Sequence, residues 1–253
     1  MVNVSACQWN LVWEDREANF THVRRLAAAA GESDLIILPE MFGSGFSMNV
    51  DSIAEADPSQ TETFLRNLAQ DCSAAVLGGL VRKDADGWGG NELIAYDSSG
   101  VELTRYRKNR TFRYTRESDH YRNGTEVSVF DYLGWKVAPF ICYDLRFPEL
   151  FRRATGRGAE LIIVIASWPT VRVEHWVTLL RARAIENLAY VVGVNRVGCD
   201  PTSEYPGRSI VVDPWGEIIA DAGGEEGVAT AALDRDKILN WRAEFPALMD
   251  LES

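Results

Sequence analysis

Short apolar strand patterns alternate with amphipathic helix patterns along almost the whole chain. A helix pattern at residues 15–30 precedes the strand "DLIILPE", and the strand "AELIIVIAS" precedes a helix pattern at residues 173–188. Other strand pairs, such as "NELIAYDSSGVELTRYRK", are joined by short turns and predict hairpins. Strands that alternate with helices and hairpins predict an α/β protein with mixed sheets covered by helices. Periodicity alone leaves open whether the protein contains one sheet or two.

No linker-like segment and no repeat interrupts this alternation, so we expect one domain over residues 1–253. The formal net charge of -11 argues against a nucleic-acid partner, which would need clustered Lys and Arg. No apolar run approaches the roughly 18 residues of a membrane span, and the chain begins with a strand pattern instead of a signal peptide. The four cysteines lie far apart without a CxxC pair, which predicts neither a zinc site nor a disulfide framework. We therefore expect a cytoplasmic protein.

Three ionisable residues each follow a predicted strand directly. Glu40 follows "LIILP", Lys108 follows "VELTRYR" and Cys142 follows "VAPFI". Side chains at strand ends can converge at one edge of a sheet, where α/β folds usually place their sites. A carboxylate, an ammonium and a thiol supply the base, the oxyanion partner and the nucleophile of covalent acyl transfer. Taken singly, each has an ordinary structural explanation, since a cysteine that ends an apolar strand is often only a small buried side chain.

A cysteine nucleophile is more often paired with a histidine. The chain contains only His22, His120 and His175, and none of them belongs to a recognisable Cys-His signature. A Cys-His hydrolase therefore stays a minor alternative. A non-catalytic binding or assembly protein is another, although such a protein would not need a nucleophile.

The segments "LIILPEMF", "YRKNRTF" and "FICYDLRFPEL" resemble the three catalytic motifs of the nitrilase superfamily, the carbon-nitrogen hydrolases. The order Glu, Lys, Cys and the intervals of 68 and 34 residues are those of that family, and the similarity extends from "ACQWN" to "DPWGEIIA". The resemblance implies a four-layer αββα sandwich of two mixed sheets with helices outside. It also implies no metal, no organic cofactor, and a homodimer or larger homo-oligomer.

The resemblance also implies a role for each motif residue. Glu40 would be the general base and Cys142 the nucleophile that forms a thioester, while Lys108 and the backbone N–H of Tyr143 would hold the oxyanion. Glu117, in "TRESDHYRNG", matches the second glutamate of the family, which orients the lysine and gives a buried ammonium its paired charge.

The segments "SWP", "ARAIEN", "VNRVG" and "FRYTRESDHYRNG" most resemble the omega-amidase branch. Its substrates are small monoamides of 2-oxo dicarboxylic acids, such as 2-oxoglutaramate and 2-oxosuccinamate. Arg172 is the candidate partner of the substrate carboxylate, and Trp168, Phe42 and Tyr143 are candidate walls of the pocket. Other amidases of the superfamily, which act on N-carbamoyl amines, deaminated glutathione or aliphatic amides, stay open as alternatives.

Overall fold

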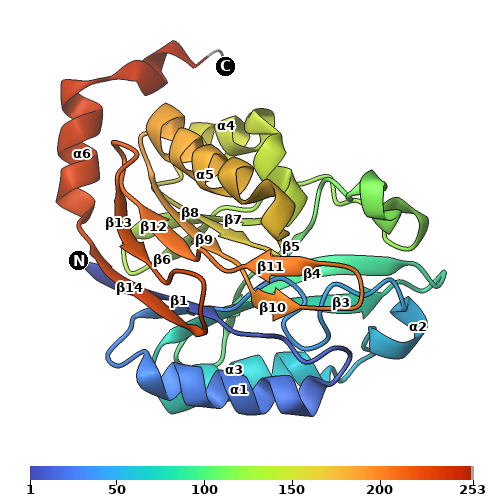
Figure 1. Ribbon diagram of the computed structural model, residues 1–253. Helices are drawn as coiled ribbons and strands as arrows, with labels where there is room; N and C mark the ends of the chain where they lie inside the picture. Colours follow the sequence, from blue (N-terminus) through green and yellow to red (C-terminus); the bar gives the residue numbers. More distant parts are fainter. Residues whose placement is uncertain (252–253) are drawn as a thin grey trace.

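The computed structural model describes residues 1–251 as two six-stranded mixed sheets that pack face to face, with helices on both outer faces (Figure 1). The four-layer αββα sandwich implied by the motifs is thereby confirmed. The first sheet has the strand order β14-β1-β2-β3-β4-β5, and β1, β2 and β3 run parallel. Its strands are β1 (Val2–Gln8), β2 (Leu35–Ile37), β3 (Ala75–Lys83), β4 (Gly89–Tyr96), β5 (Glu102–Arg107) and β14 (Gly227–Leu233).

The second sheet has the order β13-β12-β9-β8-β7-β6, with β7, β8 and β9 parallel. Its strands are β6 (Phe130–Tyr132), β7 (Trp135–Ile141), β8 (Leu161–Ile165), β9 (Tyr190–Val194), β12 (Ile210–Val212) and β13 (Ile218–Asp221). Each sheet therefore has a parallel centre, fed by helical crossovers, and antiparallel edges. Some of these edges are hairpins, but β14 pairs with β1 from the opposite end of the chain.

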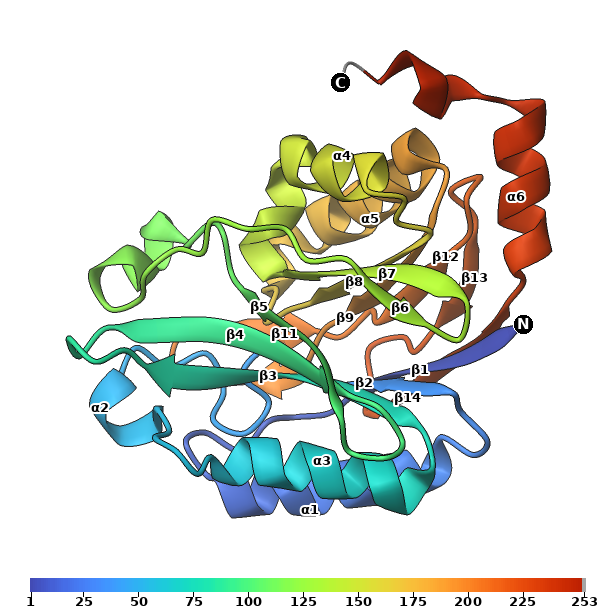
Figure 2. The same cartoon turned by 180° about the vertical axis from the view of Figure 1, so that it is seen from behind.

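Helices α1 and α3 cover the first sheet, α4 and α5 cover the second, and α6 lies beside the edge formed by β13 and β14 (Figures 1 and 2). The helices are α1 (Arg16–Ala29), α2 (Val50–Ile53), α3 (Gln60–Cys72), α4 (Pro148–Gly156), α5 (Val173–Asn187) and α6 (Arg235–Glu244). Within residues 1–251, no helix is both long and apolar enough to cross a membrane.

The strand β2 shows why the central segments are apolar without alternation. Leu35 and Ile37 belong to the core between the two sheets, whereas Ile36 belongs to the core under α1 and α3. Both faces of the strand are buried, so a polar residue on either face would lose its contact with water.

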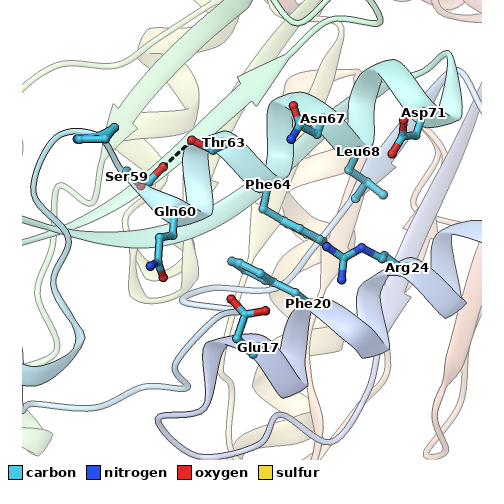
Figure 3. A pocket seen from close by; sticks show the side chains of 11 residues that line it. Glu17, Phe20, Arg24, Ser59, Gln60, Thr63, Phe64, Asn67, Leu68 and Asp71 are labelled. Carbon is cyan, nitrogen blue, oxygen red and sulfur yellow. Dashed lines mark hydrogen bonds between the residues drawn. The ribbon is translucent and has the colours of Figure 1, made fainter.

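Helices α1 and α3 pack against each other through aromatic side chains. Phe20 and Phe64 stack with ring centroids 4.0 Å apart, at a surface pocket of about 440 Å³ between the helices (Figure 3). The Ser59 side chain accepts a hydrogen bond from the Glu62 N–H and caps α3, which begins at Gln60.

Two regions of the chain contain more structure than the sequence indicated. The polar stretch after β5 contains two 3₁₀ turns, η1 (Arg113–Thr115) and η2 (Glu117–Asp119). A small hairpin of β10 (Val197–Cys199) and β11 (Glu204–Pro206) follows β9. Further short turns are η3 (Cys142–Arg146), η4 (Thr170–Arg172) and η5 (Ala247–Asp250).

Candidate active site

The four residues of the expected site meet between the two sheets. Glu40 follows β2 and Lys108 follows β5 in the first sheet, Glu117 begins η2, and Cys142 follows β7 in the second sheet. The Lys108 Nζ lies 2.9 Å from Glu40 Oε1 and 3.0 Å from each carboxylate oxygen of Glu117. All three of these charged side chains are buried. The site is therefore built from both sheets and not from one sheet edge alone.

Glu40 is held by hydrogen-bond donors on both of its carboxylate oxygens. Oε1 accepts from the Asn91 side-chain amide at 2.7 Å as well as from Lys108, and Oε2 accepts from the Ser167 N–H at 2.8 Å. Gly79 on β3 lets this segment come close, because a Cβ there would lie 2.8 Å from the Glu40 Cα. The base candidate is thus held by donors on β4 and just beyond the ends of β5 and β8, and it lies against β3.

Cys142 occupies a strained backbone position at the end of β7. Its φ is +47°, in the left-handed region that residues other than glycine rarely adopt. The chain then turns directly into η3, whose first amides have no acceptor within the helix. The Tyr143 N–H, the expected oxyanion donor, is one of these first amides.

The surroundings of Cys142 keep its thiol protonated. Burial raises the pKa of this thiol well above its usual value, and the charge of Glu40 raises it further, while Lys108 acts in the opposite direction. A thiol in this state needs a general base before it can attack a carbonyl. Of the two carboxylates that act on this thiol, Glu40 has the larger effect and Glu117 the smaller.

The surroundings of Lys108 keep its side chain in the charged, ammonium form. Burial opposes its charge, but the carboxylates of Glu117 and Glu40 outweigh burial and raise the pKa of Lys108 well above its usual value. Its short contacts are all with carboxylate oxygens. One of these bonds must therefore loosen if the ammonium is to meet an oxyanion.

A buried carboxylate ties the lysine segment to the cysteine turn. Asp144 Oδ1 accepts from the N–H groups of Asn109 (3.1 Å) and Arg110 (2.9 Å). Its Oδ2 accepts from the Tyr106 hydroxyl (2.7 Å) and the Ile141 N–H (3.1 Å). These four bonds fix the end of β5 against the end of β7, a link for which no local sequence pattern is a signal.

The cavity beside Cys142 measures about 40 Å³. Three of the candidate substrate-binding residues, Tyr143, Trp168 and Arg172, line it. Lining residues that the sequence analysis missed are Phe46, Phe112, Thr115, Arg146, Ser167, Pro169, Thr202, Ser203 and Tyr205. Three of these come from the β10–β11 hairpin, which was not predicted.

Two guanidinium groups line this cavity. Arg172 lies over the Phe112 ring at 5.3 Å, and its carbonyl accepts a hydrogen bond from the Trp168 indole at 2.7 Å. Arg146 lies over the Trp168 ring at 4.9 Å and contacts His175 at 3.0 Å. Within residues 1–251 neither arginine has a carboxylate within 4.0 Å. Both therefore have charge to offer to an anionic ligand.

Phe42 does not line the cavity, which corrects the sequence-based expectation. It is fully buried and packs edge-on to Trp9 and beside Phe20 and Phe64 in the core under α1 and α3. The chain turns after Glu40, so that Phe46, four residues after Phe42, reaches the cavity instead.

Among the described residues, 1–251, no histidine lines the cavity. His175 is held by Arg146, the half-buried His22 lies beside Glu226, and His120 borders a separate pocket. In the described part of the chain, no cluster of three or more His, Cys, Asp or Glu side chains has an arrangement that would hold a metal ion.

Comparison with known proteins agrees with this geometry. The family model described as carbon-nitrogen hydrolase matches residues 3–243. The chain is 38% identical to an omega-amidase of Yersinia enterocolitica, over 99% of this chain and 97% of the relative. It is 34% identical to a 2-oxoglutaramate amidase of Bacillus subtilis, over 87% of this chain and 85% of the relative.

The fold also matches a solved structure closely. A protein of Xanthomonas campestris, described as a CN-hydrolase superfamily protein with an arsenic adduct in its active site, aligns with a TM-score of 0.95 and 35% identity. The alignment covers 100% of this chain and 97% of that one. From its motifs, its fold and these matches, the chain belongs to the carbon-nitrogen hydrolase family.

Proposed function

We propose that this protein is an omega-amidase, which hydrolyses the terminal carboxamide of a short 2-oxo dicarboxylic acid monoamide to a carboxylate and ammonia. The observation that carries the proposal is the buried Glu40–Lys108–Glu117 cluster, placed against a thiol on a strained turn. The relatives named as omega-amidase and 2-oxoglutaramate amidase support the substrate class.

In the first half-reaction, Glu40 takes the thiol proton of Cys142 and the thiolate attacks the amide carbon. The carbonyl electrons move to oxygen, and the Tyr143 N–H and Lys108 stabilise this oxyanion. The intermediate then collapses with cleavage of the C–N bond, while Glu40 returns the proton to nitrogen. Ammonia leaves, and the acyl group stays on sulfur as a thioester.

In the second half-reaction, Glu40 takes a proton from water, and the resulting hydroxide attacks the thioester carbon. The second tetrahedral intermediate collapses with cleavage of the C–S bond, and the proton returns to the Cys142 sulfur. The acid product leaves as its carboxylate. Glu117 keeps Lys108 protonated and in place through both halves, because two carboxylates on one ammonium favour its charged form.

The far end of the substrate is anionic, and the cavity offers two cations for it. Arg172 is the proposed carboxylate partner, with Arg146 across the same cavity. The volume of about 40 Å³ holds about three water molecules, which is less room than a five-carbon substrate needs. We therefore expect Arg172 and the Phe112 ring beneath it to move when the substrate enters.

We also propose a cytoplasmic homo-oligomer that assembles through a face formed by α5, the turn between β12 and β13, and the C-terminal end of α6. Ile185, Trp215 and Phe245 are each at least two-fifths exposed on this face. Trp241 links the last two through ring contacts of 5.3 Å. Exposed apolar side chains in such a cluster favour association. Light scattering of the purified protein tests this, and a monomer at micromolar concentration would contradict it.

The test of the function is ammonia release from 2-oxoglutaramate, measured beside 2-oxosuccinamate, an N-carbamoyl amine, deaminated glutathione and an aliphatic amide. The proposal expects the highest kcat/KM on the two 2-oxo acid monoamides and no activity in Cys142→Ala. Higher kcat/KM on another panel member would keep the thiol chemistry but reject the substrate. Activity in Cys142→Ala would reject the mechanism.

A further inference from the structure

Asn91 on β4 touches three of the four site residues. Its side-chain Nδ2 donates to Glu40 Oε1 at 2.7 Å and to Glu117 Oε1 at 3.0 Å. Its backbone carbonyl accepts from the Lys108 N–H at 2.9 Å. The residue is 1% exposed. One buried amide therefore bridges the two carboxylates of the site and is also tied to the strand that carries the lysine.

The charges around this amide do not balance. Two carboxylates, those of Glu40 and Glu117, share the single ammonium of Lys108. The titratable groups that act on this cluster from the elements around it are Lys108, Cys142, Tyr121 and Tyr205, with Asp144 near the lysine. Only Lys108 among them is a cation. The proposed base step needs Glu40 as an anion, so the site has to hold two neighbouring carboxylates with one ammonium between them.

A primary amide suits this place for two reasons. It has two N–H bonds, one for each carboxylate, and hydrogen bonds to a charged acceptor stabilise the charged form. It is also neutral, so it supports both anions without forming an ion pair that would draw Glu40 away from the thiol. A second lysine or arginine would compete with the Lys108 ammonium for the same oxygens.

The other end of the same side chain supports a role beyond packing. Asn91 Oδ1 is buried and has no hydrogen-bond partner in the described part of the chain. A buried amide oxygen without a partner destabilises a fold, and such groups are uncommon. The fold tolerates the unpaired Oδ1 of Asn91 in an orientation that directs the side-chain NH₂ group to the two carboxylates of the site.

We propose that Asn91 is a positioning residue, which holds Glu40 and Glu117 on the Lys108 ammonium and keeps Glu40 ionised as the base for Cys142. The inference rests on the proposed amidase function. It predicts that Asn91 sets the acid limb of the pH profile, which is the fall of kcat/KM as the pH is lowered. This fall is expected because protonation of the base inactivates the enzyme.

The test compares Asn91→Ala and Asn91→Asp with wild type across pH 5 to 9, with 2-oxoglutaramate or the best amide of the panel. In Asn91→Ala, kcat at pH 7 should fall roughly 10- to 100-fold, the range for a lost hydrogen bond to a charged group. KM should change much less, and the acid limb should move to higher pH. Asn91→Asp should move the limb further, because it removes both donors and adds a third carboxylate.

The matched control is Asn187→Ala. Asn187 is also fully buried, but it lies on α5, where its side chain contacts Thr155 and the carbonyl of Arg183. This variant should lose thermal stability and keep the wild-type acid limb. If both Asn91 variants lose only stability and their acid limbs coincide with wild type, Asn91 is a packing residue and the proposal fails.

A second measurement separates this proposal from the amidase proposal. The rate at which iodoacetamide alkylates Cys142 also requires loss of the thiol proton and needs no substrate. The acid limb of this alkylation rate should move to higher pH in Asn91→Ala. It should stay at the wild-type pH in Asn187→Ala. That result would hold even if no amide of the panel were hydrolysed, in which case only the amidase proposal would fail. An unmoved alkylation profile would overturn the role of Asn91.

Discussion

Replacement of Glu117 by glutamine tests how much of the site depends on the second carboxylate. Glu117 accepts two 3.0 Å bonds from Lys108, one 3.0 Å bond from Asn91, and one from the Phe112 N–H. Glutamine has nearly the same volume, but it keeps one acceptor oxygen and turns an NH₂ group toward donors. Lys108 then has Glu40 as its single carboxylate partner.

The contacts of Glu117 determine how much stability and how much activity Glu117→Gln should lose. Removal of one member of a buried ion pair typically costs about 3–5 kcal/mol, and Glu40 still pairs with Lys108, so we expect about 3 kcal/mol less stability. Misplacement of an oxyanion partner costs about 3–4 kcal/mol of activation free energy, which is a fall in kcat of roughly 100- to 1000-fold. KM should change little, because Glu117 does not line the substrate cavity.

The assay is ammonia release from 2-oxoglutaramate, together with urea unfolding at pH 7.5. The matched control is Glu160→Gln, because Glu160 is also buried and pairs with Arg235 at 2.8 Å, but does not line the cavity. This control should lose stability and keep its kcat. A kcat of Glu117→Gln within about threefold of wild type would refute the role of the second carboxylate.

Three other predictions follow from the site and its surroundings. Arg172→Gln should raise KM for 2-oxoglutaramate about tenfold or more, with little effect on a neutral aliphatic amide, because only the former has a carboxylate; equal effects on both substrates would contradict this. Burial raises the pKa of Asp144 from 3.8 to about 7, so the native state holds a proton that the unfolded state has lost, and stability from this group falls as pH rises from about 4 to 7. Urea unfolding should therefore show the advantage of wild type over Asp144→Asn shrinking by up to about 4 kcal/mol across that range, and parallel pH curves would argue against it. Iodoacetamide and peptide mapping should find label on Cys142, which lines the cavity, and on the exposed Cys199, but not on Cys7, which is packed into the core under α1 and α3; faster labelling of Cys7 than of Cys142 would disprove this.

The positions of Glu40, Lys108 and Cys142 at strand ends were visible in the sequence because strand patterns and polar breaks are local signals. Glu117 was found through the motif around it. That the four meet was an expectation from the family resemblance, since the site joins two sheets and periodicity did not show how many sheets there are.

Asn91 and the carboxylate of Asp144 were missed because their partners lie far along the chain. Asn91 is 51 residues from Glu40, and Asp144 is 35 residues from Asn109. A single polar residue in an apolar strand gives no sign of what it faces across the sheet. Phe42 was misplaced for a related reason, because the turn after Glu40 decides which aromatic side chain reaches the cavity.

The most direct test of the central claim is to detect the acyl group on sulfur. Enzyme is mixed with 2-oxoglutaramate, quenched in acid within one turnover, and mapped by mass spectrometry. The account predicts an acyl adduct on the peptide that contains Cys142 in wild type, with no adduct and no ammonia release in Cys142→Ala. Ammonia release that persists in Cys142→Ala, or an adduct on any other residue, would contradict it.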